Sequence, residues 1–157
     1  MDTSEIIKSG FSARVICYED LGRVLITQRS EHSKFRSLCH DLPGGKSDLN
    51  ELPIETAARE FEEETGFIIK PKRLISLYDQ PQVHVLEDIN TTREVHIFVC
   101  RISGIEPPAT LNSEGLKYEW LHPLEAIHRL DQAVQEKAMR HAHSSNYFRL
   151  LSPRFMQ

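Results

Sequence analysis

Residues 45–67 read GKSDLNELPIETAAREFEEETGF and hold most of the chemistry that this chain discloses. Pro53 suits the first position of a helix, because the N–H that it lacks would have no partner within the helix. Gly66 suits the position just past a helix end. The segment therefore predicts a helix over residues 53–65, with the tight turn Pro43-Gly44-Gly45 in front of it.

The acidic residues of this helix are placed against its stability. On a wheel of about 100° per residue, one face gathers Ile54, Ala57, Ala58, Phe61 and Thr65. Glu60, Glu63 and Glu64 form a strip beside that face, where a helix lines a cleft. Glu60 and Glu64 repel each other, and anions in the last turn oppose the helix dipole. A bound Mg²⁺ or Mn²⁺ would relieve both effects, because hard cations prefer carboxylate oxygens.

Arg59 lies on the other side of this strip, within four residues of Glu55, Glu62 and Glu63. It can pair with these neighbours, and we expect it to orient carboxylates and to limit their repulsion. The alternative is an acidic face that only contacts water, which is the usual origin of a run of charges. The fixed residue types at fixed offsets favour the metal site.

The segment resembles the Nudix box, Gly-x5-Glu-x7-Arg-Glu-U-x-Glu-Glu-x-Gly-U with U apolar, and it matches every specified position. The resemblance implies an α/β/α sandwich with a mixed central sheet, and residues 1–157 as a single Nudix hydrolase domain. It also implies an enzyme that uses Mg²⁺ or Mn²⁺ to hydrolyse a phosphoanhydride in a nucleoside diphosphate linked to another group.

The resemblance also assigns roles to the residues of the box. The metal ligands would be three carboxylates and a backbone carbonyl of the preceding turn: Glu60, Glu63, Glu64 and Gly44 or Gly45. Either Glu60 or Glu63 would be the general base, and the choice stays open. Glu51 would be structural or would anchor Arg59.

A late loop offers one more acid. In this family a further carboxylate from such a loop often acts as base or as an extra metal ligand. Glu114 is the candidate here, with Glu119 as second choice and a solvated loop glutamate as the alternative. The expected catalytic set is then Glu60, Glu63, Arg59 and Glu114.

Basic residues precede and enter the box. Residues 23–46 carry five basic side chains against two acidic ones, a local excess of +3 that could grip phosphates. Arg29 and Lys46 are the expected substrate-binding residues, although solvated surface explains any one basic residue equally well.

The leaving group is not indicated. Residues 25–30 resemble the start of a coenzyme A pyrophosphatase signature, but Lys34 and Leu38 depart from that signature. Pro81 resembles an ADP-ribose-specific position, and residues 114–121 with a helix after them resemble small nucleoside triphosphate pyrophosphohydrolases. No subfamily is favoured.

Several other residues invite a functional reading. Four aromatic residues could stack a base or simply pack in the core: Tyr18, Tyr78, Tyr118 and Trp120. The run Cys39-His40-Asp41 cannot form a triad, because neighbours in an extended segment alternate faces. His141 and His143 point along diverging faces of a helix, which does not suit a shared metal.

The rest of the chain reads as strands with few helices. Strands are expected at 13–18, 24–28, 74–78, 83–86 and 94–101, polar connections at 29–40 and 79–93, a loop at 103–115, and helices from 123–127 and 131–143. This order suggests an α/β domain with a mixed sheet between helices.

The composition bounds the class of protein. With 157 residues, 39% hydrophobic and 27% charged, the chain is typical of one globular domain. It has no apolar run near the ~20 residues of a membrane helix and no secretory signal, so we expect a cytoplasmic protein. Three widely spaced cysteines suit free thiols in a reducing compartment.

The net charge of −4 argues against bulk nucleic-acid binding, whose footprint is a basic face. A small nucleotide is compatible with it, because bound metal can reverse the local field. We expect such a nucleotide as the partner, no membrane, and leave a homodimer open.

Two other functions on this fold stay as alternatives. One is a module that binds a nucleotide without cleaving it, which the complete set of box glutamates disfavours. The other is an isomerase of the isopentenyl diphosphate type, for which Cys39 lies near the box but lacks the Cys-Ser-His-Pro context.

Overall fold

The computed structural model describes residues 10–34, 36–86, 91–103 and 117–151. Its strands are β1 (Phe11–Tyr18), β2 (Val24–Gln28), β3 (His40–Asp41), β4 (Gly44–Lys46), β5 (Ile75–Ser76), β6 (Gln82–Leu86), β7 (Thr91–Arg101) and β8 (Lys117–Leu121). Its helices are α2 (Pro53–Thr65), α3 (Pro123–Arg129), α4 (Ala133–Ser144) and α5 (Tyr147–Leu150), with a 3₁₀ turn η1 (Pro71–Arg73).

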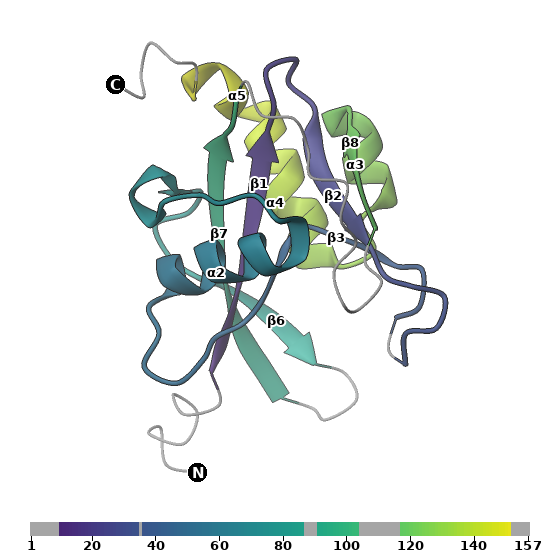
Figure 1. Ribbon diagram of the computed structural model, residues 1–157, viewed down its shortest axis with the longest axis vertical. Coiled ribbons are helices and arrows are strands. Elements are labelled where there is room, and N and C mark those ends of the chain that lie inside the picture. Colours follow the sequence, from purple (N-terminus) through teal and green to yellow (C-terminus); the bar gives the residue numbers. More distant parts are fainter. Residues whose placement is uncertain (1–9, 35, 87–90, 104–116, 152–157) are drawn as a thin grey trace.

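These strands form one mixed sheet between helices. Helix α2 lies on one face, and α3 and α4 lie on the other (Figure 1). Strand β1 runs parallel to β7 along its whole length and antiparallel to β2 and β4. The α/β fold with a mixed sheet is therefore confirmed.

Strand β1 shares one of its edges between two partners, and this division opens the molecule. At its end, Tyr18 pairs with Val24 of β2, whereas residues 12–14 near its start pair with β4. The cavity described below is lined from β1, from β4 and from the residue that follows β2, so it lies where β1 and β2 diverge.

A separate apolar core fills each face of the sheet, because side chains alternate along the strands. Ile16 of β1 belongs to the core beneath α3 and α4, and Val15 to the core beneath α2. Phe61 is the largest fully buried side chain that α2 contributes to the second core.

Helix α2 has the predicted bounds, and Gly66 ends it in the left-handed conformation with φ of 80°. Ala57, Phe61 and Thr65 of the predicted apolar face are buried. Thr56 is buried as well, because its hydroxyl donates to the Glu51 carboxylate beside the core.

The predicted strand at 24–28 is confirmed, whereas other elements differ in extent. The strand expected at 74–78 shrinks to residues 75–76. The short strand expected at 83–86 within the polar connection is present as residues 82–86. The strand expected at 94–101 begins earlier, at residue 91, and pairs antiparallel with it, because Val and Thr residues favour strands. The predicted loop at 103–115 falls almost wholly outside the described residues.

Two further observations bear on the expected class of protein. All three cysteines are free thiols, with Cys17 and Cys100 buried side by side on β1 and β7. Within the described part of the chain, no helix is both long and apolar enough to span a bilayer.

Candidate active site

The acidic edge of α2 lies against two glycines of β4. A Cβ atom on Gly45 would lie 2.5 Å from Cδ of Glu60, so a side chain there would displace that carboxylate. A Cβ atom on Gly44 would overlap the backbone of Ala13 in β1. Where a tight turn was expected, the two glycines belong to strand β4, and they let the helix and β1 approach that strand from opposite sides.

Arg59 is the centre of a carboxylate cluster behind this edge. Its guanidinium donates to Glu51 through Nε at 2.7 Å and Nη2 at 3.0 Å, a bidentate pair. It also donates to Glu60 at 3.0 Å, to Glu63 at 3.2 Å and to the carbonyl of Lys46 at 3.0 Å. These hydrogen bonds from Arg59 lower the pKa of Glu51 to about 2.

Arg59 pairs with only some of the neighbouring glutamates that the sequence suggested. Glu63 pairs with it, but Glu55 instead accepts from the backbone N–H of Leu52 at the helix start. Glu51 replaces Glu55 because the loop before α2 brings its carboxylate back against the helix, eight residues before Arg59. The cluster therefore ties the loop, the helix and β4 together.

Glu60 and Glu64 lie deeper than Glu63 and are less well compensated. Burial raises the pKa of Glu64 to about 8; Arg14 opposes this shift and the Glu60 charge adds to it. Burial also raises the pKa of Glu60, although Arg59 opposes it. Glu63 is 57% exposed and faces Arg59. Among the described residues, no three acidic, His or Cys side chains converge as a ready cation site.

A cavity of about 340 Å³ opens beside these glutamates. Glu60 and Glu64 line it together with the backbone of Gly44 and Gly45. Its other charged lining residues are basic and come from four separate segments: Arg14, Arg29, Arg36, Lys46 and Arg93. Carboxylates and cations thus share one space, which can hold a metal next to a phosphate.

Asp41 is the centre of the basic side. Its side chain is only 3% exposed and accepts from Arg36 Nη1 at 2.8 Å and Arg29 Nε at 3.4 Å. Gln135 of α4 donates to the same carboxylate at 2.9 Å. Burial opposes ionisation of Asp41, yet Arg14 and Arg36 hold its pKa below the usual value.

Comparison with known proteins decides the family. Residues 8–142 match the family model of the NUDIX domain. A MutT-like protein of Streptomyces ambofaciens is 31% identical over 128 residues, which cover 82% of this chain and 73% of that protein. The chain belongs to the Nudix family. It is an enzyme of the Nudix pyrophosphohydrolase type.

One further relative and one solved structure carry the names of hydrolases. An ADP-ribose pyrophosphatase of Bacillus subtilis (strain 168) is 31% identical over 78 residues, 49% of this chain and 42% of that protein. The Ap4A hydrolase of C. elegans superposes with a TM-score of 0.69 at 19% identity, covering 88% of this chain and 98% of that chain. This second likeness shows the fold alone.

The structure brings only some of the site residues predicted from the sequence together around the cavity. Arg29, Lys46, Glu60 and Glu64 line the cavity with the two glycines, whereas Glu63 and Arg59 lie behind it. Glu114 lies outside the described residues. The second choice, Glu119, pairs with Arg129 and does not line the cavity.

Sequence reasoning missed four residues of this Nudix site: Arg14, Arg36, Arg93 and Gln135. Arg36 was counted among the basic residues but not singled out. Arg14 carried a signal of its own, because it is the one charged residue in the largely apolar strand β1. Arg93 lay in the supposed polar connection, and Gln135 lay in a helix that gave no sign of facing the box.

The aromatic residues expected either to stack a base or to pack do the latter. Tyr118 and Trp120 each lie 6.1 Å from the ring of Phe67, at the edge of the core beneath α2. Tyr18 packs against Phe148, and Tyr78 stacks on His141. None of the four lines the cavity. His141 and His143 contact different rings, as their diverging faces predict.

Proposed function

We propose that this enzyme hydrolyses a phosphoanhydride bond in a nucleoside diphosphate linked to another group, and that it needs Mg²⁺ or Mn²⁺ to do so. One observation carries the proposal: the glutamates of α2 and a set of arginines meet in one cavity across Gly44 and Gly45. A pyrophosphate with its counter-ion needs both kinds of side chain.

The residues present fit a divalent cation. Carboxylates of Glu60 and Glu64 and the carbonyl oxygens of Gly44 or Gly45 are hard oxygen donors beside one cavity. Burial raises the pKa of both glutamates, and a bound cation would stabilise their charged forms. Glu63 would complete the set by turning from Arg59.

The bound cation would neutralise the pyrophosphate and acidify a water molecule. Arg59, fixed by Glu51, holds the Glu60 carboxylate at the cavity edge. Glu60 or Glu63 accepts the proton of the attacking water, and Glu114 is a further candidate for that role. Arg29 and Lys46 bind the phosphate oxygens on which charge builds as the bond breaks.

One relative supports the substrate class in addition to the site. The Bacillus subtilis relative is named for ADP-ribose, a nucleotide joined to a second group. We therefore propose a small nucleotide of this kind as the substrate. The cytoplasmic location stays a prediction from the sequence, and a homodimer stays an open possibility.

The test is a hydrolysis screen with Mg²⁺ and Mn²⁺ over nucleoside triphosphates, ADP-ribose, sugar nucleotides, dinucleoside polyphosphates and coenzyme A. Glu64→Gln and Glu63→Gln should each lower phosphate or pyrophosphate release at least about a hundredfold. Glu62→Gln is the matched control, because Glu62 is exposed on the same helix and should leave the rate unchanged. Full turnover in both Glu63→Gln and Glu64→Gln would refute the proposal.

A further inference from the structure

We infer that Gln135 of α4 and Asp41 of β3 are positioning residues, which hold Arg29 in the cavity so that its terminal amino groups bind a substrate phosphate. The inference rests on the proposed function, because that function makes the cavity a phosphate site. Gln135 lies 94 residues after Asp41 and belongs to no part of the Nudix box.

Asp41 divides its carboxylate between two arginines in unequal ways. Arg36 supplies the closer charge, with Nη1 at 2.8 Å from Oδ1. Arg29 approaches Oδ2 through Nε alone, at 3.4 Å. The Arg36 guanidinium already compensates the buried charge of Asp41. Asp41 therefore orients the Arg29 guanidinium through Nε and leaves its terminal amino groups able to bind another anion.

Arg29 therefore keeps most of its hydrogen-bonding capacity. Within the described chain, its only hydrogen bonds are Nε to Asp41 and the backbone N–H to the carbonyl of Cys39 at 3.0 Å. Its side chain is 34% exposed and lines the cavity. A guanidinium held at Nε presents its two terminal amino groups as a fork, the geometry that suits phosphate oxygens.

Gln135 fixes the carboxylate from the opposite layer of the molecule. Its Nε2 donates to Asp41 Oδ1 at 2.9 Å and to Gln132 Oε1 at 2.8 Å. Its Oε1 accepts from the backbone N–H of Leu42 at 2.7 Å. The Gln135 side chain is 2% exposed, and its bonds to Asp41 and Leu42 are buried, where a misplaced polar group is costly.

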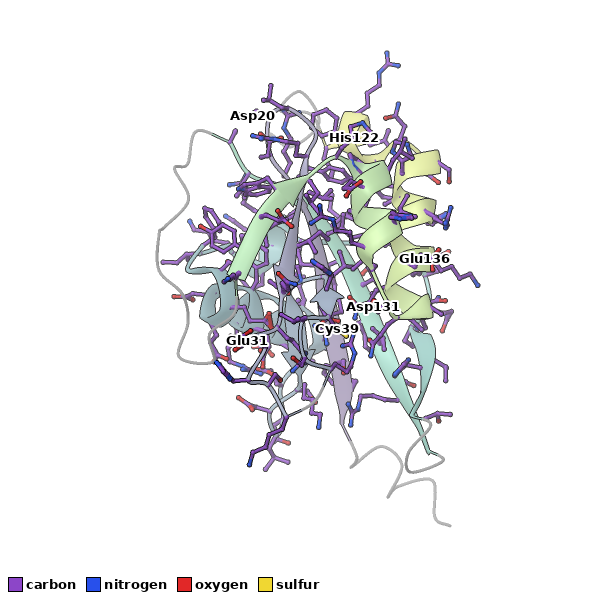
Figure 2. The ribbon with its side chains drawn as sticks, turned by 90° about the vertical axis from the view of Figure 1, so that its right-hand side faces the viewer. Asp20, Glu31, Cys39, His122, Asp131 and Glu136 are labelled. Atoms are coloured by element: carbon purple, nitrogen blue, oxygen red, sulfur yellow. The ribbon has the colours of Figure 1, made fainter. Side chains whose placement is uncertain are left out.

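The start of α4 is attached to the same segment at a second point. Asp131 accepts from the backbone N–H of His40 at 3.1 Å. Figure 2 shows Asp131 and Cys39 lying together where the loop before β3 meets α4. His40 and Leu42, on either side of Asp41, are thus held by Asp131 just before α4 and by Gln135 within it. This leaves the Asp41 carboxylate little freedom to turn away from Arg29.

Gln135→Met tests the inference, because it keeps the charge of the site and nearly the volume while removing the amide. The probe is inorganic pyrophosphate with Mg²⁺, measured by isothermal titration calorimetry. Loss of a charge-assisted phosphate contact should weaken binding about tenfold in Arg29→Gln. Gln135→Met should weaken binding about fivefold, and the double variant should bind within about twofold of Arg29→Gln alone.

The controls separate positioning from stability. Gln28→Met makes the same chemical change at an amide that donates to Leu38 in the same loop, at 3.0 Å, and should leave pyrophosphate affinity unchanged. Thermal unfolding of each variant shows whether it is folded at the assay temperature. Gln135→Asn keeps a buried amide with shorter reach, and it replaces Gln135→Met if that variant is unfolded; its affinity should then fall at least twofold.

Each outcome decides whether Gln135 positions Arg29 or has only a structural role. Wild-type affinity in the folded Gln135 variant, or an equal loss of affinity with and without Arg29, would overturn the inference and leave only a structural role. Suppose the screen finds no hydrolysis, but the affinity losses of Arg29→Gln and Gln135→Met do not multiply in the double variant. The proposed function then fails, and the positioning of Arg29 stands. If hydrolysis is found and the losses multiply, only the positioning fails.

Discussion

The two charge centres beside Gly44 and Gly45 are opposites in sign. On the α2 side a single cation, Arg59, lies among four carboxylates: Asp48, Glu51, Glu60 and Glu63. On the β3 side one buried carboxylate, Asp41, lies between Arg29 and Arg36, with the charge of Arg14 nearby. Arg36 also reaches the half-exposed Asp131, at 4.0 Å. The first centre carries an excess of negative charge and the second an excess of positive charge.

This difference shows how one cavity can accept both a cation and an anion. Each central residue fixes its neighbours by hydrogen bonds while leaving part of their charge uncompensated. Uncompensated carboxylates favour a divalent cation, and uncompensated guanidinium groups favour phosphate. If the site served stability alone, we would expect the unpaired carboxylates of the acidic centre to form ion pairs with the unpaired arginines of the basic centre across Gly44 and Gly45.

Gly45→Ala should have the largest effect on the rate of hydrolysis, and it should disturb the acidic centre only. The new Cβ atom would push the Glu60 carboxylate, which is the flexible end of its side chain, so the cost in stability is small. A misplaced group in an active site lowers the rate of hydrolysis by about a hundredfold. Steady-state kinetics and thermal unfolding measure the two effects separately.

The matched control is Gly22→Ala, in the turn between β1 and β2 at the other end of the sheet. Gly22 has φ of 83°, so alanine should lower Tm there without changing kcat/KM. Wild-type activity in Gly45→Ala would mean that the position of Glu60 is not critical.

Arg59→Met should have the next largest effect, because it removes the single cation of the acidic centre. The Glu51 side chain, 14% exposed, would keep a partly buried charge without its bidentate partner. We expect a loss of about 3 kcal/mol in the free energy of unfolding, measured by urea denaturation. Arg59→Lys should lose less, since it restores the charge but not the fork. Equal stability of all three proteins would show that the cluster is only surface.

The smallest expected effect is a loss of folding stability at acidic pH. The Arg59 hydrogen bonds depress the pKa of Glu51 to about 2, against the ordinary value of 4.5. A depressed pKa stabilises the fold fully above pH 4.5, and that stabilisation is lost as pH falls toward 2. Between pH 6 and pH 3 the wild type should lose about 1–2 kcal/mol more than Glu51→Gln. Parallel stability curves for the two proteins would contradict this pairing.

The acidic centre was largely predictable from sequence, because its geometry is local. Residues 53–65 have the spacing of a helix, and that spacing alone places Glu60 and Glu64 on one strip. The bidentate pairing of Glu51 with Arg59 needed only the return of a short loop. The resemblance to the Nudix box already offered Glu51 as the anchor of Arg59, whereas helix spacing alone pointed to Glu55, the closer residue in sequence.

The basic centre was not predictable in the same way, because it is assembled from distant segments. Arg14 reaches the cavity from β1, and Arg93 reaches it from the hairpin of β6 and β7. Gln135 contacts Asp41 only because α4 packs on the face of the sheet opposite α2. No local sequence pattern indicates which helix covers which face of the sheet. The sequence therefore pointed to Arg29 but not to Asp41 and Gln135, which hold it in place.

The central claim is that the carboxylates of α2 hold a divalent cation within the arginine-lined cavity. Anomalous diffraction from crystals of the protein soaked in Mn²⁺ tests it most directly, with crystals of Glu64→Gln as the comparison. We predict an anomalous peak within coordination distance of Glu60 and Glu64 in the wild type, lost or weakened in the variant. A peak elsewhere, or one that is unchanged in Glu64→Gln, would contradict the account.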